Sequence, residues 1–254
     1  MATQDDARLA LACLDLTSLN DDDDAPAIEA LCARAVTPRG SVAAVCVWPR
    51  FVAQARAALP REIAVAAVAN FPAGALDAAL ALADARSIVE AGGDEVDLVL
   101  PWRAMLDGRQ AEAERLVVQV RQACTGRRLK LIIESGELPT PAAIRLACAI
   151  GLDAGVDFLK TSSGKTTRGA SPAAAMLMLQ AIADHPRGAG VGFKAAGGVR
   201  SVADAAGYSV LVRDILGSSA LFATRLRFGA SALLADIERV LSGAADNAAP
   251  SSVY

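Results

Sequence analysis

Eight short apolar segments recur along the chain, each followed by a longer alanine-rich stretch whose polar residues fall at helical spacing. The centres of the segments lie roughly 20 to 35 residues apart, the length of one strand and one helix with its loops. Eight such units predict an α/β protein that is a single closed (β/α)8 barrel, the TIM-barrel fold. The predicted strands are 13–17, 42–48, 63–69, 95–100, 129–134, 156–160, 191–194 and 226–228.

The stretches between these segments carry the residues that start helices. Proline follows Thr140 and Ser171, and Ser201 stands three residues before Asp204, as in a capping box. The acidic run at 21–24 favours a helix start or a solvated loop over a metal site, because consecutive aspartates cannot all face one ion. We expect one domain over 1–254, with a short N-terminal helix and a mobile small-residue tail at 242–254.

Composition narrows the partners. The 254 residues are 54% hydrophobic and 4% aromatic, which suits a large aliphatic core, and the net charge of −3 offers no attraction for nucleic acid or an anionic membrane. No targeting segment is evident, and no apolar run approaches the roughly 20 residues of a membrane helix. Five widely spaced cysteines indicate neither a disulfide framework nor a zinc cluster. We therefore expect a cytoplasmic protein with a small-molecule partner.

Charged residues interrupt several of the predicted strands. Asp15, Asp97, Lys160 and Lys194 each occupy one, and Lys130 shares the face of a fifth with Glu134. A single such residue usually indicates an edge strand or a misread register. Repetition on so many strands weakens that account, because isolated buried charges are too costly to keep. If the barrel closes, these side chains converge at the carboxyl ends of its strands, where barrel enzymes have their active sites.

Two lysines at strand ends predict a reactive amine. Two like charges about 4 Å apart repel by roughly 4 kcal/mol at an effective dielectric near 20, or about three pKa units. Lys194 beside Lys160 would lower the pKa of an amine enough for it to attack a carbonyl group near neutral pH. Asp97 would carry protons, with Asp15 and Lys130 completing the relay. Electrostatics alone leaves open which lysine is the nucleophile, because the argument is symmetric.

Three glycine-bearing turns follow the last strands and suit a phosphate monoester. Backbone amides near a helix start, together with nearby cationic side chains, bind phosphate. Barrel enzymes often hold phosphate at the ends of their last strands. The predicted phosphate-binding residues are Gly164, Lys165, Gly197, Gly198, Arg200, Gly229 and Ser231.

These residues lie in segments that resemble the deoxyribose-phosphate aldolases, which are class I aldolases with the barrel fold. The resemblance spans nearly the whole chain in the right order, so it is specific. The matching segments are 14–20, 45–51, 70–72, 94–97, 132–138, 158–165, 192–194, 197–200 and 227–231.

The resemblance implies reversible cleavage of 2-deoxy-D-ribose 5-phosphate to D-glyceraldehyde 3-phosphate and acetaldehyde, without a metal or another cofactor. It assigns the Schiff-base lysine to Lys160, the second lysine to Lys194 and the proton-relay carboxylate to Asp97. The sequence has Ala232 where the family has a serine near the phosphate. A lost hydroxyl donor to a charged acceptor costs about 1.5 to 3 kcal/mol.

Two alternative interpretations of the function stay open. A Schiff-base aldolase acting on another sugar phosphate is the nearest alternative, and a sugar-phosphate binding protein without catalysis is a second.

Barrels of this kind often pair, so a homodimer is expected, although no motif marks its interface. Cys46 comes near the end of an apolar strand segment, and packing is its expected role. If it faces the lumen instead, an unsaturated aldehyde would be able to trap it together with Lys160.

Some members of the family end in a tyrosine, as this chain does at Tyr254. We hypothesise that the tail folds back so that the phenol assists proton transfer at the acetaldehyde-derived carbon; the alternative is a disordered end. Deleting Tyr254 should then slow both turnover and solvent deuterium exchange into acetaldehyde. Unchanged rates of both processes would show that the tail has no such role.

Overall fold

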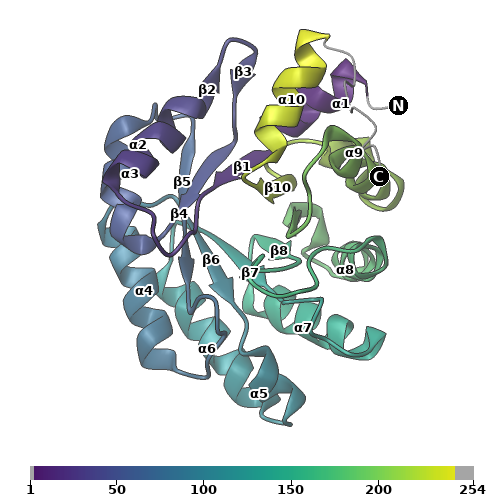
Figure 1. The fold of residues 1–254 in the computed structure, drawn as a ribbon. Coiled ribbons are helices and arrows are strands. Elements are labelled where there is room, and N and C mark those ends of the chain that lie inside the picture. Colours follow the sequence, from purple (N-terminus) through teal and green to yellow (C-terminus); the bar gives the residue numbers. More distant parts are fainter. Residues whose placement is uncertain (1–2, 244–254) are drawn as a thin grey trace, which may run out of the picture.

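The computed structural model describes residues 3–243, and eight parallel strands within them close into a barrel ringed by helices (Figure 1). Around the barrel the order is β1, β10, β9, β8, β7, β6, β5 and β4, and β4 pairs with β1 again. All eight predicted strands are therefore confirmed, within a few residues at their ends. Their bounds are β1 Leu14–Thr17, β4 Ala44–Val47, β5 Ala64–Ala69, β6 Glu95–Val99, β7 Arg128–Ile132, β8 Phe158–Lys160, β9 Gly192–Ala196 and β10 Leu226–Ala230.

The helices begin where the sequence predicts. Thr140 and Ser171 accept hydrogen bonds from the third residues of their helices, and Ser201 forms a full capping box with Asp204. Asp24 caps another helix at the end of the acidic run. The bounds are α1 Gln4–Ala12, α2 Ala25–Arg34, α3 Val52–Ala58, α4 Ala78–Glu90, α5 Trp102–Leu106, α6 Gln110–Ala123, α7 Pro141–Ala154, α8 Pro172–Asp184, α9 Val202–Leu216 and α10 Leu233–Ser242.

Smaller elements were not expected from the hydrophobic pattern. A short antiparallel hairpin, β2 Val36–Thr37 and β3 Gly40–Ser41, stands outside the barrel. Single 3-10 turns lie at Pro49–Phe51, Gly188–Gly190 and Ser218–Ala220. The predicted N-terminal helix is confirmed as α1. The predicted tail from 242 overlaps the last residue of α10, and 244–254 lie outside the described residues.

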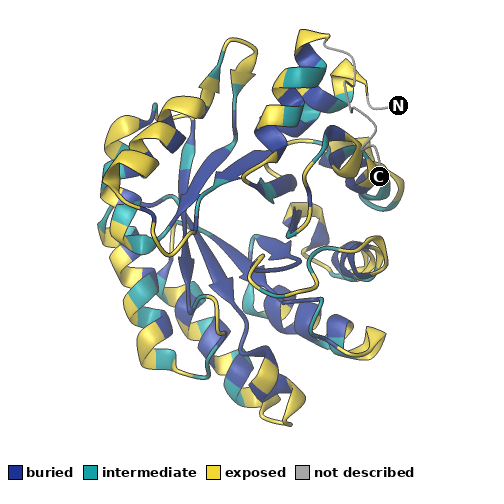
Figure 2. Ribbon diagram, in the orientation of Figure 1, coloured by how far each residue is buried: buried dark blue, intermediate teal, exposed yellow. Residues whose placement is uncertain are grey.

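Strand residues alternate between two environments. Outward-facing side chains pack against the helices in one aliphatic core, while the helices expose their outer faces (Figure 2). The inward-facing residues include the predicted charged ones, all of them buried. A barrel of eight strands is just wide enough for side chains to fill its lumen. The lumen of this barrel is therefore a packed interior that contains buried charged groups.

Close packing at the lower end of the lumen depends on a glycine. A Cβ atom built on Gly192 would lie 2.3 Å from the ring of Phe158, which occupies the neighbouring strand in register with it. Real Cβ atoms do not approach so closely, so a larger residue here must displace the ring.

We expect Gly192→Ala to destabilise the protein by about 1 to 3 kcal/mol, because overpacking forces a buried aromatic ring from its position. The exposed helical Gly207 offers a matched control, since a Cβ atom there meets nothing. Gly207→Ala should stabilise by roughly 0.5 to 1 kcal/mol. Chemical denaturation of both variants measures the two effects, and equal stabilities would show that the ring tolerates the added methyl group.

Candidate active site

Five charged side chains that the sequence places on separate strands meet in the lumen. Asp15 comes from β1, Asp97 from β6, Lys130 from β7, Lys160 from β8 and Lys194 from β9, and none is more than 3% exposed. Lys160 and Lys194 lie opposite each other in the register of β8 and β9. The predicted convergence therefore occurs.

Asp97 is the centre of this cluster. One of its oxygens, Oδ2, accepts hydrogen bonds from Lys160 Nζ and Lys194 Nζ, each at 2.8 Å. The other oxygen, Oδ1, accepts from Lys130 Nζ at 2.7 Å. Lys194 donates a further hydrogen bond to Asp15 Oδ2 at 2.5 Å. A single buried carboxylate is thus shared by three amines.

The two lysines at the strand ends are not equivalent. Lys194 is held by two carboxylates and is fully buried, whereas Lys160 contacts Asp97 alone and lines an open cavity. An amine with access to the cavity is the one that a carbonyl compound can reach. The geometry thus distinguishes the lysines where electrostatic reasoning from the sequence could not.

The charges shift the two pKa values in opposite directions. Burial lowers the pKa of Lys160, and the charge of Lys194 lowers it further, against an opposing contribution from Asp97. Burial also opposes the charge on Lys194, but Asp15 and Asp97 outweigh it and raise the pKa of that amine. Burial contributes most to the shift at Lys160, a cause that the sequence argument gave less weight than the neighbouring lysine. Lys160 is the better nucleophile of the two.

The carboxylates remain ionised. Burial favours the neutral form of Asp97, yet Lys130, Lys160 and Lys194 together hold its pKa well below the ordinary value. The pKa of Asp15 is lowered in the same way by Lys194, Arg227 and Lys130. Asp97 is an ionised carboxylate within hydrogen-bond distance of Lys160 Nζ, and this position allows it to relay protons beside that amine.

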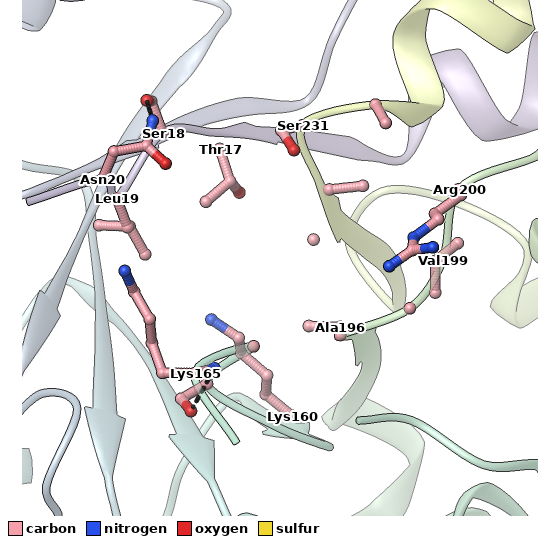
Figure 3. Close-up of a pocket in the computed structure, with 17 residues that line it drawn as sticks. Thr17, Ser18, Leu19, Asn20, Lys160, Lys165, Ala196, Val199, Arg200 and Ser231 are labelled. Carbon is pink, nitrogen blue, oxygen red and sulfur yellow. Dashed lines mark hydrogen bonds between the residues drawn. The ribbon is translucent and has the colours of Figure 1, made fainter. Parts of the chain in front are cut away.

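A cavity of about 330 Å³ opens above Lys160 at the carboxyl ends of the strands (Figure 3). The ammonium groups of Lys160 and Lys165 and the guanidinium of Arg200 all border it. Every predicted phosphate-binding residue lines this cavity: Gly164, Lys165, Gly197, Gly198, Arg200, Gly229 and Ser231.

Some backbone amides in the cavity wall are free to bind an anion, and others already have a hydrogen-bond partner. Gly197 and Gly198 both have positive φ angles, 83° and 91°, so the chain turns sharply after β9. The amides of Arg200 and Ser201 are already engaged, since both donate to Asp204 Oδ2. The start of α10 has no side-chain cap at Ala232, which leaves its first amides open to an anion.

The loop after β1 also lines the cavity, although the sequence analysis assigned it no role. Ser18 and Asn20 both donate hydrogen bonds to the buried Asp23, and Trp48 Nε1 donates to the carbonyl of Asn20 at 2.9 Å. Asp23 thus fixes the loop. The signal in the sequence was the Ser-Leu-Asn segment directly after a predicted strand, because the loops that follow the strands of a parallel barrel form its active site.

A second layer of charges lies below the first and was also missed. Glu95 and Arg227 are almost fully buried, and Arg227 donates to Asp15 Oδ1 at 2.5 Å and to Glu95 Oε1 at 2.9 Å. Alternation along a strand would have revealed Glu95, because it lies two residues before Asp97 and so faces the same side.

Three predicted side chains have different outcomes. Cys46 is fully buried and faces the lumen beside Leu19, and burial raises the pKa of its thiol, which favours packing. Glu134 lies beyond the end of β7 with a φ of 52° and accepts from Ser163 N, so it does not join the lysine cluster. Tyr254 lies outside the described residues.

Metal-ligating side chains do not gather within residues 3–243: no group of three or more is placed to hold an ion there. The lumen carboxylates Asp15, Glu95 and Asp97 are instead paired with lysine and arginine nitrogens. The same part of the chain contains no helix long and apolar enough to cross a membrane.

A parallel barrel with a buried, cavity-lining amine beside a carboxylate has the groups that a Schiff-base aldolase needs. Residues 9–239 match the family model described as "DeoC/LacD family aldolase", and the chain belongs to this family. It is 44% identical over 240 residues to the deoxyribose-phosphate aldolase of Agrobacterium fabrum, covering 93% of this chain and 92% of the relative.

Solved structures show the same fold. A Toxoplasma gondii structure assigned as a deoxyribose-phosphate aldolase superposes with a TM-score of 0.86 at 23% identity, covering 96% of each chain. The deoxyribose phosphate aldolase of Aeropyrum pernix, described as tetrameric, has a TM-score of 0.71 at 24% identity, over 92% of this chain and 91% of that one.

The inequality of the two lysines can be tested at Lys194. In Lys194→Met, a cation beside Lys160 is lost and Oδ2 of Asp97 is left to Lys160 while Lys130 keeps Oδ1, and both changes raise the pKa of Lys160. The acid limb of the pH profile of kcat/KM should move to higher pH, and kcat/KM at neutral pH should fall at least about tenfold.

Lys165→Met is the matched control, because Lys165 lines the same cavity without contacting Asp97. It should raise KM and leave the acid limb in place. If the acid limb of Lys194→Met keeps its wild-type position, Lys194 does not set the pKa of Lys160.

Proposed function

We propose that this aldolase reversibly cleaves 2-deoxy-D-ribose 5-phosphate to D-glyceraldehyde 3-phosphate and acetaldehyde, through a Schiff base at Lys160. The observation that carries the proposal is a buried amine, hydrogen-bonded to Asp97, that opens into a cavity lined by Lys165, Arg200 and the start of α10. The relative from Agrobacterium fabrum supports the choice of substrate.

The first steps follow from the position of Lys160. Its neutral amine attacks the aldehyde carbon of the open-chain sugar, and the resulting carbinolamine loses water to form an iminium ion. Asp97, hydrogen-bonded to the same nitrogen, is placed to take and return the protons of these steps. Lys194 and Lys130 keep that carboxylate ionised between the steps.

Bond cleavage then draws electrons toward the iminium nitrogen. A base removes the proton of the 3-hydroxyl group, the bond between carbons 2 and 3 breaks, and glyceraldehyde 3-phosphate leaves. The enamine that remains on Lys160 is protonated at carbon 2 and hydrolysed to acetaldehyde. Asp97, with Lys130 and Asp15 behind it, forms the proton relay in this scheme.

The phosphate group is held at the ends of the last strands. Lys165 and Arg200 supply positive charge, while Gly197, Gly198, Gly229 and Ser231 border the same end of the cavity, with Gly164 beside Lys165. Holding the phosphate fixes the distance from the aldehyde to the amine and so lowers the entropic cost of attack.

Three further properties are part of the proposal. The five cysteines are unpaired and buried, which fits a reducing cytoplasm. A homodimer stays a prediction, which light scattering would check. Cys46 faces the lumen, so addition of its thiol to the carbon–carbon double bond of an unsaturated aldehyde also stays a prediction.

Borohydride reduction in the presence of acetaldehyde tests the chemistry. A Schiff base is reduced to a stable secondary amine, so mass mapping should find the added two-carbon group on Lys160. Lys160→Leu should abolish both the label and retro-aldol turnover. Label on another lysine would overturn the assignment, and no label at all would favour a binding protein without catalysis.

A panel of sugar phosphates then separates this activity from that of a related aldolase. We expect the 2-deoxy sugar phosphate to give the highest kcat/KM. If a different sugar phosphate is cleaved faster, the proposed Schiff-base mechanism stands but the proposed substrate is wrong.

A further inference from the structure

The lower layer of the lumen is joined to the upper layer through Asp15 and through Lys130. Asp15 accepts from Arg227 on Oδ1 and from Lys194 on Oδ2. Glu95 accepts from Arg227 on Oε1, and its Oε2 lies 2.5 Å from Lys130 Nζ. Neither Glu95 nor Arg227 lines the cavity above Lys160. Both can therefore affect the reaction only through their neighbours.

Arg227 orients Asp15. The residue is 3% exposed, and its guanidinium also donates to the carbonyl of Ala223. Because the guanidinium occupies Oδ1, the other oxygen of Asp15 is turned toward Lys194. This contact keeps the charge of Lys194 in place beside Lys160.

Glu95 orients Lys130 in the same way. Its Oε2 forms an ion pair with Lys130 Nζ at 2.5 Å, and Lys130 donates a hydrogen bond to Asp97 Oδ1. With Oδ1 engaged, Asp97 presents Oδ2 to the two lysines at the strand ends. The carboxylate that faces the reaction is therefore positioned from below.

Packing alone does not account for this layer. Buried ion pairs are commonly no more stabilising than aliphatic residues of similar volume, and the rest of the barrel is aliphatic. Phe158 already fills the lower lumen, with the guanidinium of Arg227 5.7 Å from the centre of its ring. The ion pairs thus have another use than filling space.

We propose that Arg227 and Glu95 are positioning residues that act through Asp15 and Lys130 to set the balance of charge around Lys160. This inference rests on the proposed Schiff-base function and adds two residues to it. The buried cations of the lumen are Lys130, Lys160, Lys194 and Arg227, and the buried anions are Asp15, Glu95 and Asp97. One cation is in excess, and Lys160 has the fewest carboxylate partners.

The titratable groups around Lys160 come from every side of the barrel. Any change in its titration must be read against all of them. They are Asp15 on β1, Cys46 on β4, Glu95 and Asp97 on β6, Arg128 and Lys130 on β7, Glu134 and Lys165 in the loops above, Lys194 on β9 and Arg227 on β10.

Opposite charge changes should move the amine in opposite directions. Arg227→Gln removes the excess cation, so Lys160 retains its proton to higher pH and the acid limb of kcat/KM shifts upward. Glu95→Gln removes an anion, so the limb shifts downward. Each shift should be on the order of one pH unit. KM for the phosphorylated substrate should stay near its wild-type value in both variants, because the cavity wall is untouched.

Arg225→Gln is the matched control. Arg225 lies just before β10, and within residues 3–243 its side chain donates only to backbone carbonyls, those of Gly188, Ala189 and Val191. Its loss should lower the melting temperature and leave the acid limb unmoved. Arg227→Lys, which keeps the charge, should return the limb toward the wild-type position.

The inference is wrong if the acid limbs of Arg227→Gln and Glu95→Gln move in the same direction, or if they do not move. If Arg227→Gln fails to fold, as circular dichroism would show, the isosteric Glu95→Gln decides alone: its limb must shift downward relative to Arg225→Gln. Borohydride trapping of the wild-type protein separates the two proposals. Absence of label on Lys160 refutes the function, whereas label on Lys160 with unmoved limbs refutes only the positioning role.

Discussion

One oxygen atom of Asp97 that accepts hydrogen bonds from two lysines is the constraint on which the site depends. In a lumen that excludes water, that carboxylate cannot neutralise both amines fully. Lys194 has a second carboxylate in Asp15, so the deficit falls on Lys160. Burial lowers the pKa of Lys160, and the single carboxylate partner of this amine does not reverse that shift. A reactive amine thus arises from burial together with the small number of its carboxylate partners.

The barrel separates this chemistry from substrate binding. Charged pairs fill the lumen, while the glycine turns and helix starts that suit a phosphate lie at the open end. The outer aliphatic core carries the stability of the fold, because the strands bury their other faces against the helices. Polar residues can therefore occupy the lumen without leaving the barrel short of buried apolar surface.

Alternation along the strands explains why the lumen contains two charged layers. Residues two apart on a strand face the same side, so Glu95 lies below Asp97 and Arg227 lies below Gly229. Gly229 leaves room for the chain of Lys194, whose Cε would lie 2.9 Å from a Cβ atom at that position. The same periodicity that hides apolar residues from water thus stacks the charges.

The order of strands, the helix caps and the convergence of Asp15, Asp97, Lys130, Lys160 and Lys194 could be predicted from the sequence, because they follow from local periodicity and one rule of barrel closure. The partner of each charge could not. Asp15 and Arg227 are 212 residues apart, and only closure of the barrel places them in contact. Which lysine faces the cavity also depends on the direction of side chains in three dimensions. Periodicity assigns a residue to a face, whereas its pKa depends on distances that only the folded chain determines.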